Sequence, residues 1–287
     1  MHTPSSAAVG RTVESLVRRR TAAEERSTPP QNSDMQVLGS LHEGRTRAWS
    51  LPLSAYVETF SDVPTSTMFA VENAAVANVV TERKREFATV RYCARQALRQ
   101  IGVSAVPILP DADGVPQWPS GVVGSMTHCA GYRAAVVARC RDLRGVGIDA
   151  EPHAPVPGPV RDFMLRDEEW ALLAVLSEAR PDVHWDRIFF CAKEAAYKTL
   201  FPLTRCWLDF TDLSVELSAS GTFEARVLAR EPGFADPELG RLAGKWLVRH
   251  GLVVATTCVR RGAVEGIRRC DPGEDCNADL FGFGGQG

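Results

Sequence analysis

The sequence predicts an α+β fold made of two halves that meet near residues 140–146. Two stretches, one on each side of that point, show the three- and four-residue spacing of apolar side chains that is typical of long amphipathic helices. Short segments rich in β-branched and aromatic residues surround both stretches. This mixed order of helices and strands indicates an α+β architecture.

The first helix is expected over residues 82–100, with Gly102 placed to cap its C-terminus. The second is expected over about 185–200, and Pro202 should stop it because proline lacks a backbone N–H. Strands are predicted at 132–138, 145–148, 207–217 and 222–228, followed by a hairpin of 245–249 and 252–259 that turns at His250 and Gly251.

The composition divides the chain into four segments. Residues 1–35 are rich in Ser, Thr, Arg, Glu and Pro and lack apolar periodicity, so we expect a disordered N-terminal extension. Residues 36–143 and 144–262 are the expected N-terminal and C-terminal halves of the folded body. Residues 263–287 end in a glycine-rich run and are expected to form a flexible tail.

The composition also argues against several classes of protein. Of 287 residues, 45% are hydrophobic and 24% are charged, as in an ordinary globular protein. The net charge of −2 argues against a nucleic-acid binder, and no apolar run is long enough to span a membrane. Eight cysteines occur without close pairs, and no secretory signal is visible, so we expect a cytoplasmic location.

The first chemical pattern lies in residues 146–152. Side chains of a strand alternate between its faces, so Asp149 and Glu151 point to the same side. Two carboxylates placed in this way can converge on a hard cation such as Mg²⁺, and Gly147 would leave room for a ligand near the backbone. A strand end with two solvated acids explains this pattern equally well when it is taken alone.

The second pattern lies in residues 189–198. Glu194 and Lys198 are one helical turn apart, with Lys193 beside them. Such a pair is commonly a surface ion pair that contributes about 0.3 kcal/mol. These charges lie in an otherwise strongly apolar helix, which favours a site in which Glu194 supplies a third carboxylate and the lysines face phosphate oxygens.

The third pattern is the run of glycines and small hydroxyl residues in 118–132. It predicts a loop whose backbone could approach a ligand. A lone histidine is more often structural than functional, so this segment alone does not assign a role to His128.

Taken together and in this order, these segments resemble the 4′-phosphopantetheinyl transferases of the surfactin- and enterobactin-synthetase type, closest to their actinobacterial branch. The resemblance rests on Gly-Ser-Met-Thr-His-Cys at 124–129, Gly-Ile-Asp-Ala-Glu at 147–151 and Phe-Cys-Ala-Lys-Glu-Ala-Ala-Tyr-Lys at 190–198. A basic stretch at 83–95 also resembles the first long helix of that family. The similarity covers roughly residues 45–260.

The resemblance implies a pseudo-dimer of two similar halves, each a small antiparallel sheet packed on a long helix, with the active site in the cleft between them. It also implies transfer of 4′-phosphopantetheine from coenzyme A to a serine of an acyl- or peptidyl-carrier protein, in fatty-acid, polyketide or nonribosomal-peptide biosynthesis. Adenosine 3′,5′-bisphosphate would be released. The implied cofactor is Mg²⁺, for which Mn²⁺ could substitute, and the expected state is a monomer.

The resemblance and the chemistry of the residues assign side chains to three sets. The metal site takes Asp149, Ala150, Glu151 and Glu194. Coenzyme A is expected to contact Arg83, Arg91, Thr127, His128, Asp149, Lys193, Glu194 and Lys198. The catalytic residues are Asp149 beside the pyrophosphate, Glu194 as the candidate general base and Lys198 beside the leaving group.

One segment departs from the family pattern. In close relatives this loop often carries basic residues that help to hold the nucleotide, whereas residues 110–114 here read Pro-Asp-Ala-Asp-Gly. Acidic side chains cannot replace a basic phosphate contact.

Two other functions would use similar residues. A magnesium-dependent phosphohydrolase or nucleotidyl transferase also uses paired carboxylates, but the sequence offers no clear second metal site. A non-catalytic module that binds coenzyme A or a carrier protein would not require the acids and Lys198 together.

Overall fold

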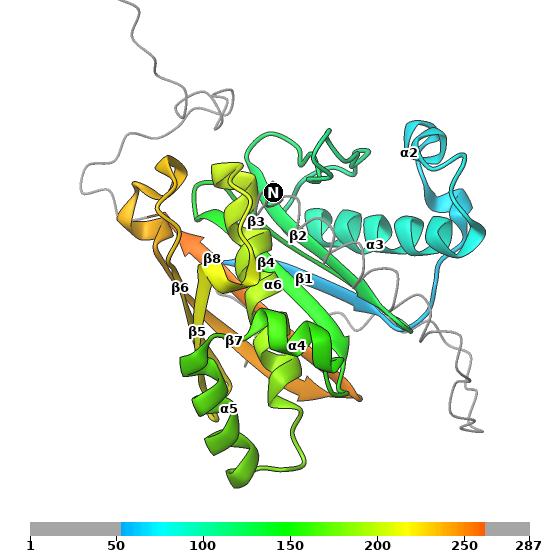
Figure 1. Cartoon of the computed structure of the whole chain (residues 1–287). Helices are drawn as coiled ribbons and strands as arrows, with labels where there is room; N and C mark the ends of the chain where they lie inside the picture. Colours follow the sequence, from blue (N-terminus) through cyan, green and yellow to red (C-terminus); the bar gives the residue numbers. More distant parts are fainter. Residues whose placement is uncertain (1–52, 262–287) are drawn as a thin grey trace, which may run out of the picture.

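The computed structural model describes residues 53–261, which form two antiparallel sheets, each packed against one long helix (Figure 1). This confirms the predicted α+β fold. The expected N-terminal extension, 1–35, and the expected tail, 263–287, lie outside the described residues. Among the described helices, none combines the length and the apolarity needed to cross a membrane.

The first half contains a three-stranded sheet in the order β1-β3-β2, and its central strand β3 pairs antiparallel with both neighbours. The long helix α3 covers one face of this sheet. The elements of this half are β1 (Ser54–Thr59), a short 3-10 turn (Thr65–Thr67), α2 (Ala70–Ala75), α3 (Thr81–Gln100), β2 (Val122–Cys129) and β3 (Tyr132–Arg139).

The second half contains a five-stranded antiparallel sheet in the order β4-β8-β7-β6-β5. The long helix α6 packs across one face of it. The elements of this half are β4 (Leu143–Pro152), α4 (Gly158–Met164), α5 (Asp167–Ala179), α6 (Trp185–Thr204), β5 (Leu213–Ser218), β6 (Thr222–Val227), β7 (Arg241–Arg249) and β8 (Leu252–Arg260), with 3-10 turns at Phe210–Asp212, Pro232–Phe234 and Pro237–Leu239.

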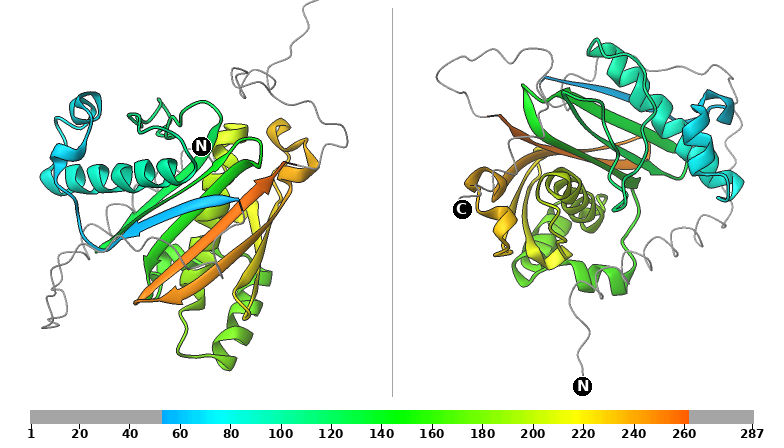
Figure 2. Two further views of the ribbon diagram at one scale, coloured as in Figure 1. Left: turned by 180° about the vertical axis from the view of Figure 1, so that it is seen from behind. Right: turned by 90° about the horizontal axis from the view of Figure 1, so that it is seen from above.

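Strand β3 is buried on both faces because it lies between α3 and the second half. Ala135 and Val137 belong to the core beneath α3, where small side chains such as Ala94 let the helix approach closely. The alternate side chains, Ala134 and Val136, share a core with β4 and β8. The layers therefore follow the order α3, three-stranded sheet, five-stranded sheet and α6 (Figure 2).

The halves are connected in sequence by a short turn. Strand β3 ends at Arg139 and β4 begins at Leu143, and the N–H of Asp142 donates to the carbonyl of Arg139 (2.9 Å). Most of the contact between the halves therefore comes from packing between the two sheets rather than from the chain connection.

A buried polar network adds a second contact between the halves. The carboxylate of Glu58 on β1 is 4% exposed and accepts hydrogen bonds from Tyr56 Oη (2.6 Å) and Tyr132 Oη (2.7 Å). Arg249, at the end of β7 in the second half, pairs with the same carboxylate. Burial raises the pKa of both phenols, so both remain protonated donors at neutral pH. Three partners compensate for the burial of this charge.

Strand β4 lies unusually close to α6, and Gly147 makes this approach possible. A Cβ atom at Gly147 would lie 2.0 Å from the carbonyl oxygen of Ala195 and 2.4 Å from Thr199 Oγ1. The expectation that Gly147 leaves room for a ligand is therefore wrong, because α6 occupies that room.

Replacement of Gly147 by alanine is expected to lower the free energy of unfolding by about 2–3 kcal/mol, because the new methyl group must displace helix backbone. Urea denaturation measures this change. The control is Gly158→Ala at the first turn of α4, where a Cβ would have no neighbour within 4 Å and stability should be unchanged or higher. Equal stability of the two variants would contradict the close packing of β4 on α6.

Residues 122–129 form the strand β2 and not the loop that the small residues suggested. These small residues permit close packing within the protein. At Gly124 a Cβ would lie 2.6 Å from the ring of Trp118, while Ser125 and Thr127 are buried against β4. The prediction failed because small polar residues fit a tight strand junction as well as a ligand-binding loop.

Helix α6 continues through Pro202 and ends at Thr204, so the predicted stop is wrong. Proline removes one hydrogen bond and crowds the carbonyl one turn earlier, but its fixed φ suits a helix, and Pro202 lies close enough to the end of α6 that only the last turn is affected. The helix is closed instead by Arg205, which adopts a left-handed conformation with φ of 54°.

Strand β5 begins at Leu213, six residues later than the sequence predicted. The residues before it form a 3-10 turn that is capped by acidic side chains. The N–H of Asp209 donates to Asp212 Oδ2 (2.8 Å), which holds the turn and delays the strand.

Candidate active site

Strands β2 and β4 belong to different sheets but run side by side where the two halves meet (Figure 1). Hydroxyl groups of β2 accept hydrogen bonds from the backbone of β4. The Ile148 N–H donates to Ser125 Oγ (3.2 Å), and the Ala150 N–H donates to Thr127 Oγ1 (3.1 Å). Asp149 lies between these two bonded residues, so the junction fixes its place relative to the first half.

Asp149 is 4% exposed, and its two carboxylate oxygens have different surroundings. Oδ1 accepts hydrogen bonds from Lys198 Nζ (2.6 Å) and Thr127 Oγ1 (3.3 Å). Oδ2 is buried and has no hydrogen-bond partner within residues 53–261. The buried thiol of Cys191 lies nearby, and burial, followed by the charges of Asp149 and Glu151, raises its pKa well above the usual range. An unsatisfied buried carboxylate oxygen is costly, which indicates a ligand position.

Glu151 and Glu194 add negative charge beside Asp149. Burial, followed by the charge of Asp149, raises the pKa of Glu151 to about 8, and Glu194 contributes in the same direction. Glu151 Oε2 lies 3.5 Å from Nη1 of Arg187. The carboxylates are therefore close enough to repel one another.

Lys198 supplies the positive charge at this point. Burial alone would lower its pKa, but the charges of Asp149 and Glu194 more than offset this effect, and its pKa lies above the usual range. Lys198 is therefore protonated at neutral pH and bound to the Asp149 carboxylate.

The donor chemistry of these residues fits a hard cation. Within residues 53–261, no three His, Cys, Asp or Glu side chains are arranged closely enough to enclose a metal ion as they stand. The unpartnered oxygen of Asp149 and the mutual repulsion with Glu151 and Glu194 are nevertheless features that a divalent cation would relieve. Oxygen donors are those that Mg²⁺ prefers. Ala150 could contribute only its backbone carbonyl, because its side chain is a methyl group, which packs in the core between the halves.

A second cluster lies on the α3 side of β2. Neighbouring residues of a strand face opposite ways, so His128 points toward α3 whereas Thr127 points toward β4. His128 Nε2 lies 2.9 Å from Arg83 Nη1, and both side chains are about 40% exposed. The buried carboxylate of Glu86 lies behind them, 2.7 Å from Arg83 Nη1 and 3.5 Å from His128 Nε2. The prediction omitted Glu86, although its position three residues after Arg83 was a usable signal.

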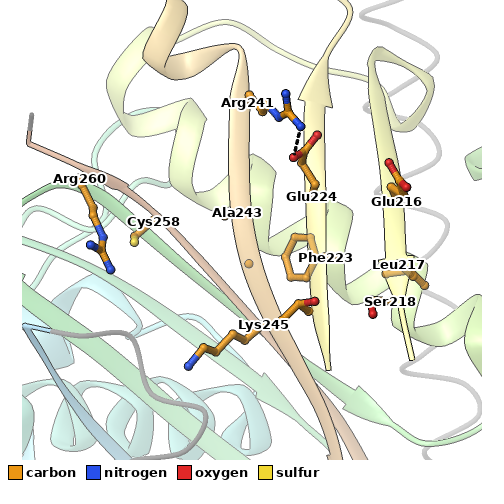
Figure 3. A pocket seen from close by; sticks show the side chains of 12 residues that line it. Glu216, Leu217, Ser218, Phe223, Glu224, Arg241, Ala243, Lys245, Cys258 and Arg260 are labelled. Carbon is orange, nitrogen blue, oxygen red and sulfur yellow. Dashed lines mark ion pairs between the residues drawn. The ribbon is translucent and has the colours of Figure 1, made fainter. Parts of the chain in front are cut away.

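A separate groove of about 690 Å³ is lined by side chains of strands β5 to β8 (Figure 3). Arg241 and Glu224 form an ion pair at one part of it, and Lys245 and Arg260 line other parts. The groove contains none of the residues that the sequence patterns singled out, so the candidate site is assigned to the β2–β4 junction.

Comparison with known proteins matches both halves of the chain. The sequence model of one family, the 4′-phosphopantetheinyl transferase N-terminal domain, matches residues 71–138. The sequence model of the 4′-phosphopantetheinyl transferase superfamily matches residues 145–255. The chain belongs to the 4′-phosphopantetheinyl transferase family. The resemblance that the sequence patterns suggested is thereby confirmed, and with it the class of enzyme.

Relatives within this family include actinobacterial proteins. The 4′-phosphopantetheinyl transferase Svp of Streptomyces mobaraensis is 45% identical over 214 residues, which cover 74% of this chain and 86% of Svp. PptT of Mycobacterium tuberculosis is 46% identical over 205 residues, covering 70% of this chain and 89% of PptT. Enterobactin synthase component D of Salmonella typhi is 44% identical over 70 residues, or 24% of this chain and 28% of that protein.

Lys193 does not lie with the other candidate residues of the transferase. Its side chain is buried, and Nζ donates to Glu169 Oε2 (2.7 Å) and to the carbonyl oxygens of Met164 (2.7 Å) and Phe210 (2.9 Å). All three hydrogens of the ammonium group are used inside the C-terminal half. This position contradicts the expectation that Lys193 faces phosphate oxygens, and we assign it a structural role.

Replacement of Lys193 by methionine is expected to lower the free energy of unfolding by about 3–5 kcal/mol, because Glu169 would keep a buried charge without its partner. Urea denaturation checks this value. The double variant Lys193→Met/Glu169→Gln should recover part of the loss, since glutamine is neutral and still accepts hydrogen bonds. Weaker binding of coenzyme A with unchanged stability would instead return Lys193 to the ligand-binding set.

Arg91 is also separated from the Arg83 and His128 pair. It lies about two turns further along α3, is buried, and donates from Nε to the carbonyl of Ile108 (2.8 Å). Burial lowers its pKa to about 10, so it remains charged at neutral pH. In this arrangement Arg91 anchors the chain just before the acidic loop, and the structure does not bring it together with Arg83 and His128.

The acidic loop, residues 110–114, is bound to the second half. Asp111 Oδ2 lies 2.6 Å and Asp113 Oδ2 lies 3.3 Å from Nη1 of Arg205, the residue that closes α6. Asp111 Oδ1 accepts the N–H groups of Asp113 and Val115 (2.9 Å each), which shapes the loop. The acids that depart from the family pattern therefore connect the two halves.

The left-handed conformation of Arg205 allows this connection to be tested. Glycine adopts that conformation readily, so Arg205→Gly should keep or raise the unfolding midpoint even though the exposed ion pairs are lost. Hydrogen exchange of the loop amides should become faster, because the loop loses its contact with α6. Asp113→Asn, which removes only the longer ion pair, is the control and should have the smaller effect. Unchanged exchange in Arg205→Gly would show that Arg205 does not hold the loop.

Proposed function

We propose that this transferase moves 4′-phosphopantetheine from coenzyme A to a serine of an acyl- or peptidyl-carrier protein, with Mg²⁺ as cofactor and adenosine 3′,5′-bisphosphate as the second product. The observation that carries this proposal is the Asp149 carboxylate, which is buried at the junction of the halves with one oxygen bound to Lys198 and the other without a partner. The neighbouring carboxyl groups of Glu151 and Glu194 would supply the remaining oxygen ligands, and a bound cation would favour their ionised forms.

The metal would be held by Asp149, Glu151 and Glu194, with the backbone of Ala150 available between the first two. When bound, a divalent cation offsets negative charge on the pyrophosphate oxygens. Mn²⁺ prefers similar oxygen donors and should substitute for Mg²⁺.

The residues of the chain would then move the proton and offset the charge of the leaving group. The serine oxygen forms a bond to the β-phosphorus while the bond from this phosphorus to the bridging oxygen breaks. Glu194, half-buried on α6, is the candidate base for the serine proton. Lys198, one turn further along, is charged and lies beside Asp149, so it can offset the charge that develops on the leaving group and donate a proton to it.

Arg83 and His128 would bind the 3′-phosphate of the nucleotide. They lie beside each other, are partly exposed, and are supported from behind by Glu86. Two such donors suit a phosphate group, and they lie away from the bonds that change. Their contribution is therefore to binding rather than to the transition state.

The test is the intact mass of an apo carrier protein after incubation with the transferase, coenzyme A and Mg²⁺. A gain of one phosphopantetheine unit, absent with EDTA, is expected. Partial similarity to enterobactin synthase component D makes a peptidyl-carrier domain one suitable substrate to test, beside an acyl-carrier protein.

Asp149→Ala and Glu194→Ala should each abolish this gain while the variants remain folded. Arg83→Ala is the contrast variant and should raise the KM for coenzyme A while most of kcat is kept. Normal turnover of Asp149→Ala would contradict the assignment of the active site to this cluster. Cleavage of coenzyme A without a carrier protein would indicate a hydrolase, and binding without turnover would indicate a non-catalytic module.

A further inference from the structure

We propose that Thr127 is a positioning residue that holds the Asp149 carboxylate in one orientation, so that Oδ2 is directed to the cation. This inference rests on the proposed function of the Asp149 site. Thr127 comes from the first half and Asp149 from the second, so the orientation of a catalytic group would depend on the assembly of the two halves.

The Thr127 hydroxyl makes two hydrogen bonds in different roles. Its side chain is 2% exposed, and Oγ1 accepts the N–H of Ala150 (3.1 Å) while it donates to Asp149 Oδ1 (3.3 Å). A hydroxyl has a single hydrogen. The Ala150 N–H can only donate and the carboxylate oxygen accepts, so the hydroxyl hydrogen is directed to Asp149.

Asp149 needs such a partner because its last side-chain torsion is intrinsically broad. Lys198 Nζ binds Oδ1 at 2.6 Å, but Lys198 is partly exposed and has a long flexible side chain. Thr127 is short, β-branched and buried in a strand, so its hydroxyl is fixed. The two donors on Oδ1 leave Oδ2 as the unpartnered oxygen.

The buried hydroxyl also limits what Thr127 can do for coenzyme A. The resemblance placed Thr127 among residues that contact this substrate, but both hydrogen bonds of Oγ1 are made inside the protein. In this arrangement the hydroxyl has no further hydrogen to donate to coenzyme A, and the side chain serves Asp149.

Ser125 provides a matched control from the same strand. It lies two residues earlier, is 5% exposed, and accepts the N–H of Ile148 through Oγ (3.2 Å). It has no carboxylate partner among the described residues. Loss of the Ser125 hydroxyl therefore removes a bond between β2 and β4, and loss of the Thr127 hydroxyl removes the same kind of bond together with the contact to Asp149.

The first experiment measures binding of Mg²⁺ by isothermal titration of MgCl₂ into the full-length protein with coenzyme A and without carrier protein. Thr127→Val, which keeps the shape and removes the hydroxyl, should weaken Mg²⁺ binding at least about tenfold, as is typical when a partner of a metal ligand is lost. Thr127→Ser should restore it to within about twofold. Ser125→Ala should leave Mg²⁺ binding within about twofold of wild type. Equal weakening by Thr127→Val and Ser125→Ala, or no rescue by serine, would overturn the proposal.

A second experiment needs no metal. In EDTA, a double-mutant cycle of Thr127→Val with Asp149→Ala should give non-additive shifts of the urea midpoint, and the same cycle with Ser125→Ala should be additive. Additive shifts in both cycles would refute the contact even if the enzyme is active. A wild-type protein that neither binds Mg²⁺ nor modifies a carrier would count against the proposed function, while a non-additive Thr127 cycle would still support the positioning of Asp149.

Discussion

Strand β4 is confined from two directions, and the candidate site depends on that confinement. On one side Gly147 lets the backbone of α6 approach until no side chain fits between them. From the other direction Ser125 and Thr127 bind the N–H groups of β4 in place of a strand partner. Because side chains alternate along a strand, a fixed β4 also fixes Asp149 and its neighbours relative to both halves.

The electrostatic character of the site follows from where β4 lies. Acidic side chains at the edge of a packed interface lose solvation, so their charges affect one another more strongly than they would in water. The result is a raised pKa at Glu151 and a tight ion pair between Asp149 and Lys198. Strand β2 serves both clusters, since Thr127 points to the acids and His128 to Arg83.

Sequence periodicity was sufficient for the long helices and the last hairpin, because a continuous apolar stripe determines which face of an element is buried. The placement of Asp149 and Glu151 on the same side of a strand could likewise be predicted from the sequence. Periodicity could not reveal β2, because the small polar residues of β2 accept hydrogen bonds from β4, 23 residues away in the sequence. Lys193 shows the same limit, because its position beside Glu194 does not reveal the hydrogen-bond partners that α4, α5 and the turn before β5 place around it.

The acidic loop gives a further case. Comparison with the family pattern shows only that this loop has two aspartates where basic residues are common. Their partner, Arg205, lies far along the chain, and its role depends on a left-handed backbone that no local rule predicts for arginine. Tertiary partners of this kind explain residues that sequence comparison alone can only mark as exceptions.

The short turn of residues 140–142 has an implication for how this enzyme could be divided. The halves are consecutive in the chain and are joined there by this turn, yet Thr127 and Asp149 lie on opposite sides of it. A chain opened within the turn would give two fragments, each carrying an incomplete site, whose apolar sheet faces provide the surface for reassociation. Phosphopantetheine transfer by such a split enzyme would show that the two fragments had associated. The modification of the carrier protein is covalent, so it would persist after the fragments separate.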